Sequence, residues 1–423
     1  GASDHDYSFT YVQGDLQIGK KDLSVTPDTQ TITYGDTVPG STTLTYSGFI
    51  AGEGLANLIT VPTASSGQSG VVNAGTYLAN YTASGGVADN YNFQYFTGNL
   101  VVNKKNLNVT ANNQSINYGV SVPATTVSYS GFITGEDASF LDTAPTTSSV
   151  QSGIVTAGTY AANYTASGGV DDNYSFNYIS GDLIVNKKDL NVTAGNRTVF
   201  YGTNVPATTL TYTGFITGED ETHLSTAPTA SSALSGMVPV GTYLGNYTVS
   251  GGVSNDYTFH YTAGDFIVTK KQLTIAADPK AITYGAVVPT GSITYIGFAP
   301  GEDASYLTTQ PTLSSGLSGV QHAGTYASNY TVTGASSSNY SFVYLAGDLT
   351  VNKATLTATA ANQTITYGAS VPTTTVSYTG FVAGENASVI DTLATVASSQ
   401  SGIAHAGGYA GNYTLSGASD HDY

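Results

Sequence analysis

The stretch NYSFNYISGDLIVNKKDLNVTA (Asn173–Ala194) decides the fold of this chain, because apolar and polar residues alternate along most of it. Such alternation is typical of β-strands with one buried face. The pattern breaks at Ser180-Gly181, which predicts a hairpin or a bulged long strand. It then passes from Lys187 to Lys188 without a Gly, Pro or Ser spacer. We therefore expect units that follow one another with a linker of one or two residues, which leaves them little freedom.

Variants of this stretch recur every 83 residues, apart from one additional residue in the first unit. A TYG or FYG motif places its tyrosine at Tyr34, Tyr118, Tyr201, Tyr284 and Tyr367, and a GFxxGE motif begins at Gly48, Gly131, Gly214, Gly297 and Gly380. A fixed period of this kind predicts a repeat array in which each unit contacts mainly its neighbours.

The period predicts five domains, at residues 21–104, 105–187, 188–270, 271–353 and 354–423. Residues 1–20 match the closing strands of a preceding repeat, which are the strands that the fifth domain lacks. Each unit reads as six or seven short strands, which favours an all-β fold: a small Ig-like β-sandwich or a β-grasp-like sheet. We expect the domains to form an elongated rod.

The composition excludes several classes of function. Charged residues make up only 9% of the chain and its net charge is −17, so it cannot assemble the basic patch that nucleic acids or anionic membranes require. There is no cysteine, no long apolar run and no nucleophile, phosphate-loop or dinucleotide motif. We therefore expect neither an enzyme nor membrane insertion of this segment.

The candidate site residues are few. Acidic turns precede the NYxF strands, and Asp171, Asp172, Asp420 and Asp422 are the calcium candidates among them. No repeat carries a complete calcium-loop pattern, and the alternative is a solvated turn held by local hydrogen bonds. No catalytic, cofactor-binding or other metal-ligating residue is predicted.

The remaining polar motifs read as structural. The glutamate of GFxxGE is expected to cap a helical turn, paired lysines at the domain joints to be solvated, and the asparagine of NYT to face outward. The histidines read as surface or loop residues: His5, His223, His260, His322, His405 and His421.

Together, TYG, GFxxGE, GTYxxNYT and the terminal VNK resemble the MBG-type (YGX class) tandem repeats of large bacterial surface and haemagglutinin-like proteins. The resemblance spans essentially the whole chain, and FYG at Phe200–Gly202 departs from it mildly. It implies an extracellular array of β-domains in an adhesin, stalk or filament, and it brings no catalytic residues.

The chain starts and ends with GASDHDY (Gly1–Tyr7 and Gly417–Tyr423), whereas the inner repeats differ at this place. The offset of 416 residues favours a longer super-repeat within one continuous polypeptide, and the identical overlap supports this reading. The alternative is a fibre subunit whose leading strand completes the fifth domain of another copy. The leading function is structural, and the other alternative is a set of modules that bind carbohydrate or protein. The expected partners are neighbouring repeats, other copies and cell-surface or glycan ligands.

Overall fold

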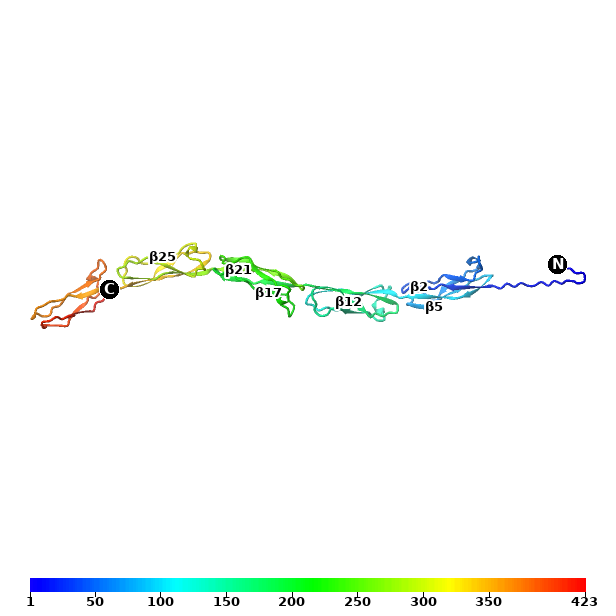
Figure 1. The fold of residues 1–423 in the computed structure, drawn as a ribbon, viewed down its shortest axis with the longest axis horizontal. Coiled ribbons are helices and arrows are strands. Elements are labelled where there is room, and N and C mark those ends of the chain that lie inside the picture. The colour runs from blue at the N-terminus through cyan, green and yellow to red at the C-terminus, as the bar shows by residue number, and fades with distance from the viewer. The chain divides into compact units, whose positions relative to one another are not determined.

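The computed structural model describes all 423 residues and contains only strands and five short 3₁₀ turns (Figure 1). The predicted all-β class is confirmed. No helix is long and apolar enough to cross a membrane. Two compact units make up the chain: Gly1–Asp189 with Ile216–Gly218 and Ser254–Thr258, and Leu190–Phe215 with Glu219–Val253 and Phe259–Tyr423. The boundaries of the five repeats remain predictions from the sequence.

The first two repeats have seven strands each. Repeat 1 contains β1 (Lys21–Pro27), β2 (Gln30–Thr33), β3 (Leu44–Ser47), η1 (Leu55–Asn57), β4 (Thr63–Ser66), β5 (Gly75–Ser84), β6 (Tyr91–Tyr95) and β7 (Thr97–Asn103). Repeat 2 contains β8 (Lys105–Ala111), β9 (Gln114–Asn117), β10 (Val127–Ser130), η2 (Ala138–Phe140), β11 (Thr146–Ser149), β12 (Gly158–Ser167), β13 (Tyr174–Ile179) and β14 (Gly181–Asn186).

The next two repeats follow the same order. Repeat 3 contains β15 (Lys188–Ala194), β16 (Arg197–Phe200), β17 (Leu210–Thr213), η3 (Glu221–His223), β18 (Thr229–Ser232), β19 (Gly241–Ser250), β20 (Tyr257–Thr262) and β21 (Gly264–Thr269). Repeat 4 contains β22 (Lys271–Ala277), β23 (Lys280–Thr283), β24 (Ile293–Ile296), η4 (Ala304–Tyr306), β25 (Thr312–Ser315), β26 (Gly324–Thr333), β27 (Tyr340–Leu345) and β28 (Gly347–Asn352).

Each of these repeats is built from two sheets. In repeat 1 a three-stranded sheet has the order β3-β1-β6 and a four-stranded sheet has the order β2-β7-β5-β4. The pairs β1–β6 and β2–β7 are parallel, and the other pairs are antiparallel. Strand β1 lies against β5 and β7 of the other sheet, and its Leu23 and Val25 are fully buried, as are Tyr81 of β5 and Leu100 of β7. Two facing sheets without a helix support the sandwich alternative over the β-grasp-like one.

The break at Ser180-Gly181 is the point where the chain crosses between sheets. Strand β13 pairs with β8 in the three-stranded sheet, and β14 pairs with β9 and β12 in the four-stranded sheet. A Cβ on Gly181 would lie 2.2 Å from the carbonyl oxygen of Ala111, so only glycine fits at the crossing. Both predicted alternatives are therefore wrong: β13 and β14 do not pair as a hairpin, and they are two strands of different sheets and not one bulged strand.

The NYT asparagines do not face outward as predicted. In β12 the pairing with β14 shifts between Tyr160 and Tyr164, and Ala162 has a φ of 51°. This bulge turns both Asn163 and Tyr164 inward, where the Asn163 side chain is 2% exposed and its amide donates to Ser149 Oγ at 2.9 Å. The sequon asparagine is therefore a structural hydrogen-bonding residue in the folded repeat.

Repeat 5 has fewer strands: β29 (Thr357–Ala360), β30 (Val376–Thr379), η5 (Ala387–Val389), β31 (Thr395–Ser398) and β32 (Tyr413–Ser416). They form two separate two-stranded sheets, β29-β30 and β31-β32. Residues 1–20 form no strand.

Candidate functional site

The most regular polar feature of the structure is a carboxylate shared by two tyrosines at the joint between repeats. Tyr34 of repeat 1 donates its hydroxyl hydrogen to Glu136 Oε1 at 2.6 Å, and Tyr174 of repeat 2 donates to Glu136 Oε2 at 2.6 Å. The two tyrosine rings meet edge to face at 5.4 Å. The predicted capping role of this glutamate is wrong, because Asp137 caps the 3₁₀ turn by accepting from the Ser139 amide.

The same arrangement recurs along the second unit. Glu302 accepts from Tyr201 of repeat 3 and from Tyr340 of its own repeat. Glu385 accepts from Tyr284 of repeat 4 and from Tyr423. In repeat 1, Glu53 accepts from Tyr91 of its own repeat. We call this three-residue contact between neighbouring repeats the tyrosine clamp.

The clamp tyrosines are held in the neutral form. Burial, followed by the hydrogen bond to Glu136, raises the pKa of Tyr174 to about 12. Burial and the hydrogen bond to Glu302 likewise raise the pKa of Tyr201 to about 12. Because only the protonated hydroxyl can donate to a carboxylate, the clamp is intact throughout the neutral pH range.

The glycine of the TYG motif in repeats 1, 2 and 4 lies against the next repeat. A Cβ on Gly35 would lie 2.5 Å from Ile133 Cγ2 of the next repeat, and Gly35 has a φ of +98°. Gly119 stands in the same relation to Ile216, and Gly285 to Val382. The tyrosine thus supplies the hydrogen bond, and the glycine allows the next repeat to approach the backbone.

A second contact at each joint caps a backbone amide. Asn173 Oδ1 accepts from the Ala74 amide at 2.8 Å, and Asp422 Oδ1 accepts from the Ala323 amide at 2.6 Å. The equivalent pairs are Ala157 with Asp256, and Val240 with Asn339.

The joint lysines also take part in these contacts. Lys104 Nζ donates to the Asp171 carbonyl oxygen of the next repeat at 2.6 Å, and Lys187 Nζ donates to that of Ser254 at 2.7 Å. Both lysines are exposed, as predicted, and in addition they bond to the next repeat.

The structure gives the calcium candidates different roles. Asp171 accepts from the amides of Asn173 and Tyr174, and Asp420 accepts from those of Asp422 and Tyr423. Both carboxylates accept local hydrogen bonds within their own turns, although Asp171 is buried and not solvated; calcium binding stays a prediction. Asp172 is exposed, whereas Asp422 lies at the joint between repeats 4 and 5.

All six histidines are exposed, as predicted, but two of them converge on Asp422. His322 Nδ1 lies 2.6 Å from Asp422 Oδ2, and His421 Nδ1 lies 3.1 Å from Asp422 Oδ1. His322 belongs to repeat 4 and the other two residues to repeat 5. The sequence carried no local signal for this cluster, because His322 and Asp422 are 100 positions apart.

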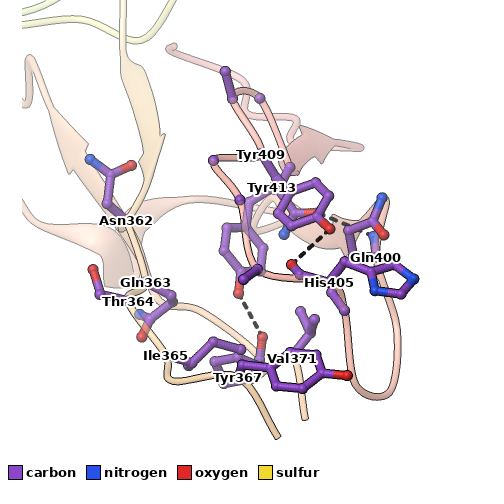
Figure 2. Close-up of a pocket in the computed structure, with 18 of the residues that line it drawn as sticks. Asn362, Gln363, Thr364, Ile365, Tyr367, Val371, Gln400, His405, Tyr409 and Tyr413 are labelled. Carbon is purple, nitrogen blue, oxygen red and sulfur yellow. Dashed lines mark hydrogen bonds between the residues drawn. The ribbon is translucent and has the colours of Figure 1, made fainter. Parts of the chain in front are cut away.

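Repeat 5 contains a cavity of about 520 Å³ between two segments of its chain, which Figure 2 shows with Ile365 and Tyr367 on one side and Tyr409 and Tyr413 on the other. In repeat 4 the equivalent place holds β28, which pairs with β23 and β26. A smaller cavity of about 150 Å³, lined by residues including Leu356 and Ala358, lies where β27 pairs with β22 in repeat 4.

The core of repeat 5 is correspondingly exposed. Leu356 and Ala358 are half-buried, whereas their counterparts in β22, Leu273 and Ile275, are fully buried. In repeat 4, β27 pairs with β22 and covers this part of the core, whereas in repeat 5 β29 pairs only with β30.

Comparison with known proteins matches the family model of the MBG domain (YGX type) to residues 23–101, 107–184, 190–267, 273–350 and 356–423. No curated protein matches the chain. Three similar solved structures are the I9–I11 tandem from titin (12% identity, 58% of this chain and 99% of that one, TM-score 0.18), immunoglobulin domains 1–4 of Sidekick-1 (10%, 76% and 96%, 0.18) and Drosophila N-cadherin EC1–4 (10%, 81% and 94%, 0.15). At these TM-scores the three structures support no argument about function.

Proposed function

Because this chain belongs to the MBG domain family of the YGX type, we propose that it is a structural repeat region of an extracellular bacterial adhesin, stalk or filament. Its role is to provide reach and mechanical continuity at the cell surface. The observation that carries the proposal is the recurring tyrosine clamp, which ties repeats 1 and 2, 3 and 4, and 4 and 5 together through a tyrosine of the preceding repeat. Joints of this kind restrict the bending that a flexible linker would allow.

The test compares the end-to-end distance of the full chain with that of a variant carrying Tyr34→Phe, Tyr201→Phe and Tyr284→Phe. Small-angle X-ray scattering should give a longer maximum dimension for the unaltered chain than for the variant. The control is Tyr367→Phe, since Tyr367 is 68% exposed. Equal, coil-like scattering from the chain and the variant would contradict the structural role. Antibody labelling of intact source cells tests the extracellular location.

A second candidate function is self-assembly by strand addition, and the cavity of repeat 5 is the observation that favours it. The segment YSFTYVQGDLQIGK (Tyr7–Lys20) aligns without a gap with YSFVYLAGDLTVNK (Tyr340–Lys353), which forms β27 and β28. Leu16 and Ile18 are 86% and 83% exposed, whereas their counterparts Leu349 and Val351 are buried.

We propose that Ser8–Lys20 of a second copy occupies the two cavities of repeat 5 and adds one strand to each of its two sheets, next to Tyr423. Burying Leu16 and Ile18 would contribute roughly 1.5–3 kcal/mol each. Because donor and acceptor lie on different parts of the chain, the contact is heterologous and propagates into a filament.

Light scattering over a concentration series tests this assembly. The unaltered chain should grow in mass with concentration, and Leu16→Asp with Ile18→Asp should remain monomeric. Val12→Asp is the matched control, because Val12 is exposed and its counterpart Leu345 is exposed as well. A variant extended after Tyr423 by the sequence of residues 8–20 should fill its own cavity and stay monomeric. A monomer at every concentration, or equal growth of the double variant, would refute strand addition.

A further inference from the structure

The joint between repeats 4 and 5 carries a cluster of ligand atoms that the other joints lack. His322, His421 and Asp422 each offer one ligand atom, and these atoms lie within 4.8 Å of one another. At the position of His322 the first three repeats have Asn73, Thr156 and Pro239.

Two imidazoles and one carboxylate form a donor set that suits divalent transition metals. Zn²⁺ in proteins takes nitrogen ligands at about 2.0–2.1 Å and carboxylate oxygens at about 2.0–2.2 Å, commonly with water in the remaining position. Both histidines are exposed, so their rings can turn toward a shared ion, whereas the Asp422 side chain is 12% exposed and fixed in place. Calcium and magnesium prefer oxygen ligands, and this cluster offers one carboxylate.

Neighbouring groups orient the ligands. The Ala323 amide donates to Asp422 Oδ1 at 2.6 Å, and this contact directs the carboxylate toward His322. The Tyr284 ring stacks on the His322 ring at 6.3 Å with an interplanar angle of 12°. Outer contacts of this type commonly position metal ligands in proteins. The nearby Glu385 accepts from Tyr284 and Tyr423, and its charge adds to the negative potential around the cluster.

We propose that His322, His421 and Asp422 bind one divalent transition-metal cation and that binding locks the joint between repeats 4 and 5. The ligands come from both repeats, so the bound ion holds them together. The amide hydrogen of Ala323 reports directly on this contact, since its acceptor is Asp422 of the next repeat.

The test is a calorimetric titration of the full chain with ZnCl₂ near neutral pH, together with the chain carrying His322→Asn or His421→Asn. Asparagine already stands at these positions in other repeats, as Asn73 and Asn255, so both variants should fold. The unaltered chain should bind one Zn²⁺ at this cluster, and each variant should lose about tenfold or more in affinity because a ligand is removed. His405→Asn is the matched control, since His405 occupies the same place in repeat 5 and is absent from the cluster.

Two further readouts separate a built site from adventitious binding to surface histidines. Zn²⁺ should slow the amide exchange of Ala323 but leave that of Val240, at the joint between repeats 3 and 4, unchanged. Co²⁺ should give visible d–d bands that His322→Asn abolishes. The proposal is wrong if His405→Asn weakens binding as much as His322→Asn, if Zn²⁺ leaves Ala323 exchange unchanged, or if Ca²⁺ binds equally well without the histidines.

Discussion

Replacing Tyr34 by phenylalanine removes one hydroxyl from the tyrosine clamp between repeats 1 and 2 and leaves the ring in place. Tyr34 is 6% exposed and donates to Glu136 at 2.6 Å. A hydrogen bond to a charged group contributes about 1.5–3 kcal/mol. Because Glu136 is half-buried and water can solvate the freed oxygen, we expect the lower end, about 1.5 kcal/mol.

The amide of Ala74 measures this loss, because its acceptor is Asn173 of the next repeat. A joint that opens about 1.5 kcal/mol more easily exchanges this amide hydrogen about tenfold faster in Tyr34→Phe. The amide of Val240, which Asn339 caps at another joint, should exchange at an unchanged rate. Tyr367→Phe controls for the loss of a hydroxyl from an exposed ring. Unchanged exchange at Ala74 would show that the tyrosine clamp does not stabilise the joint.

The remaining predictions concern pH and glycine. Since the pKa of Tyr174 and Tyr201 is raised from 10.0 to about 12, the clamp should be complete below pH 10 and weaken as the pH rises toward 12. Over that range the tyrosinate absorbance should rise as the maximum dimension from X-ray scattering falls. Gly35→Ala should loosen the joint between repeats 1 and 2, because its Cβ would clash with Ile133. Gly368→Ala is the control, since Gly368 has a similar φ but open space around it and should cost only local backbone strain. Hydrogen exchange of the Ala74 amide should be faster in Gly35→Ala and unchanged in Gly368→Ala. Gly98→Ala should destabilise repeat 1 by roughly 1–3 kcal/mol, because its Cβ would lie 2.3 Å from the Pro27 carbonyl oxygen. Gly40→Ala is the control, since a Cβ there would meet nothing within 4 Å. Hydrogen exchange of the buried amides of repeat 1 should be faster in the first variant and nearly unchanged in the second.

The sequence was sufficient to predict the strands, because their signal is local. Alternation in KDLNVTA matches the burial of β15, where Leu190 and Val192 are fully buried and Asn191 between them is exposed. The sequence also showed the break at Gly181, but not that the chain passes there from one sheet to the other. Glycine is required at this point by the close carbonyl oxygen of Ala111, about 70 positions away in the sequence. The inward Asn163 was missed because it depends on a positive φ at Ala162, a residue that rarely adopts one.

The joints could not be predicted, because each is divided between two repeats. Glu136 resembled a helix cap beside η2, yet one of its partners, Tyr34, stands 102 positions earlier. His322 and His421 each looked like an isolated surface residue, and only the contact between repeats 4 and 5 brings them to Asp422. A periodic sequence shows that units repeat, whereas the residues that join them depend on the orientation of one unit against the next.

The parallel pairing of β2 with β7 has a consequence for a repeat under tension. Strand β2 is near the beginning of repeat 1 and β7 is its last strand, and they run side by side from Gln30 opposite Leu100 to Thr33 opposite Asn103. A pull at the two ends of the repeat draws such strands in opposite directions along their length. The hydrogen bonds between them are then loaded in shear, all at once, instead of opening one after another from one end. The pairing of β9 with β14 and of β23 with β28 places the same shear-loaded pair in repeats 2 and 4.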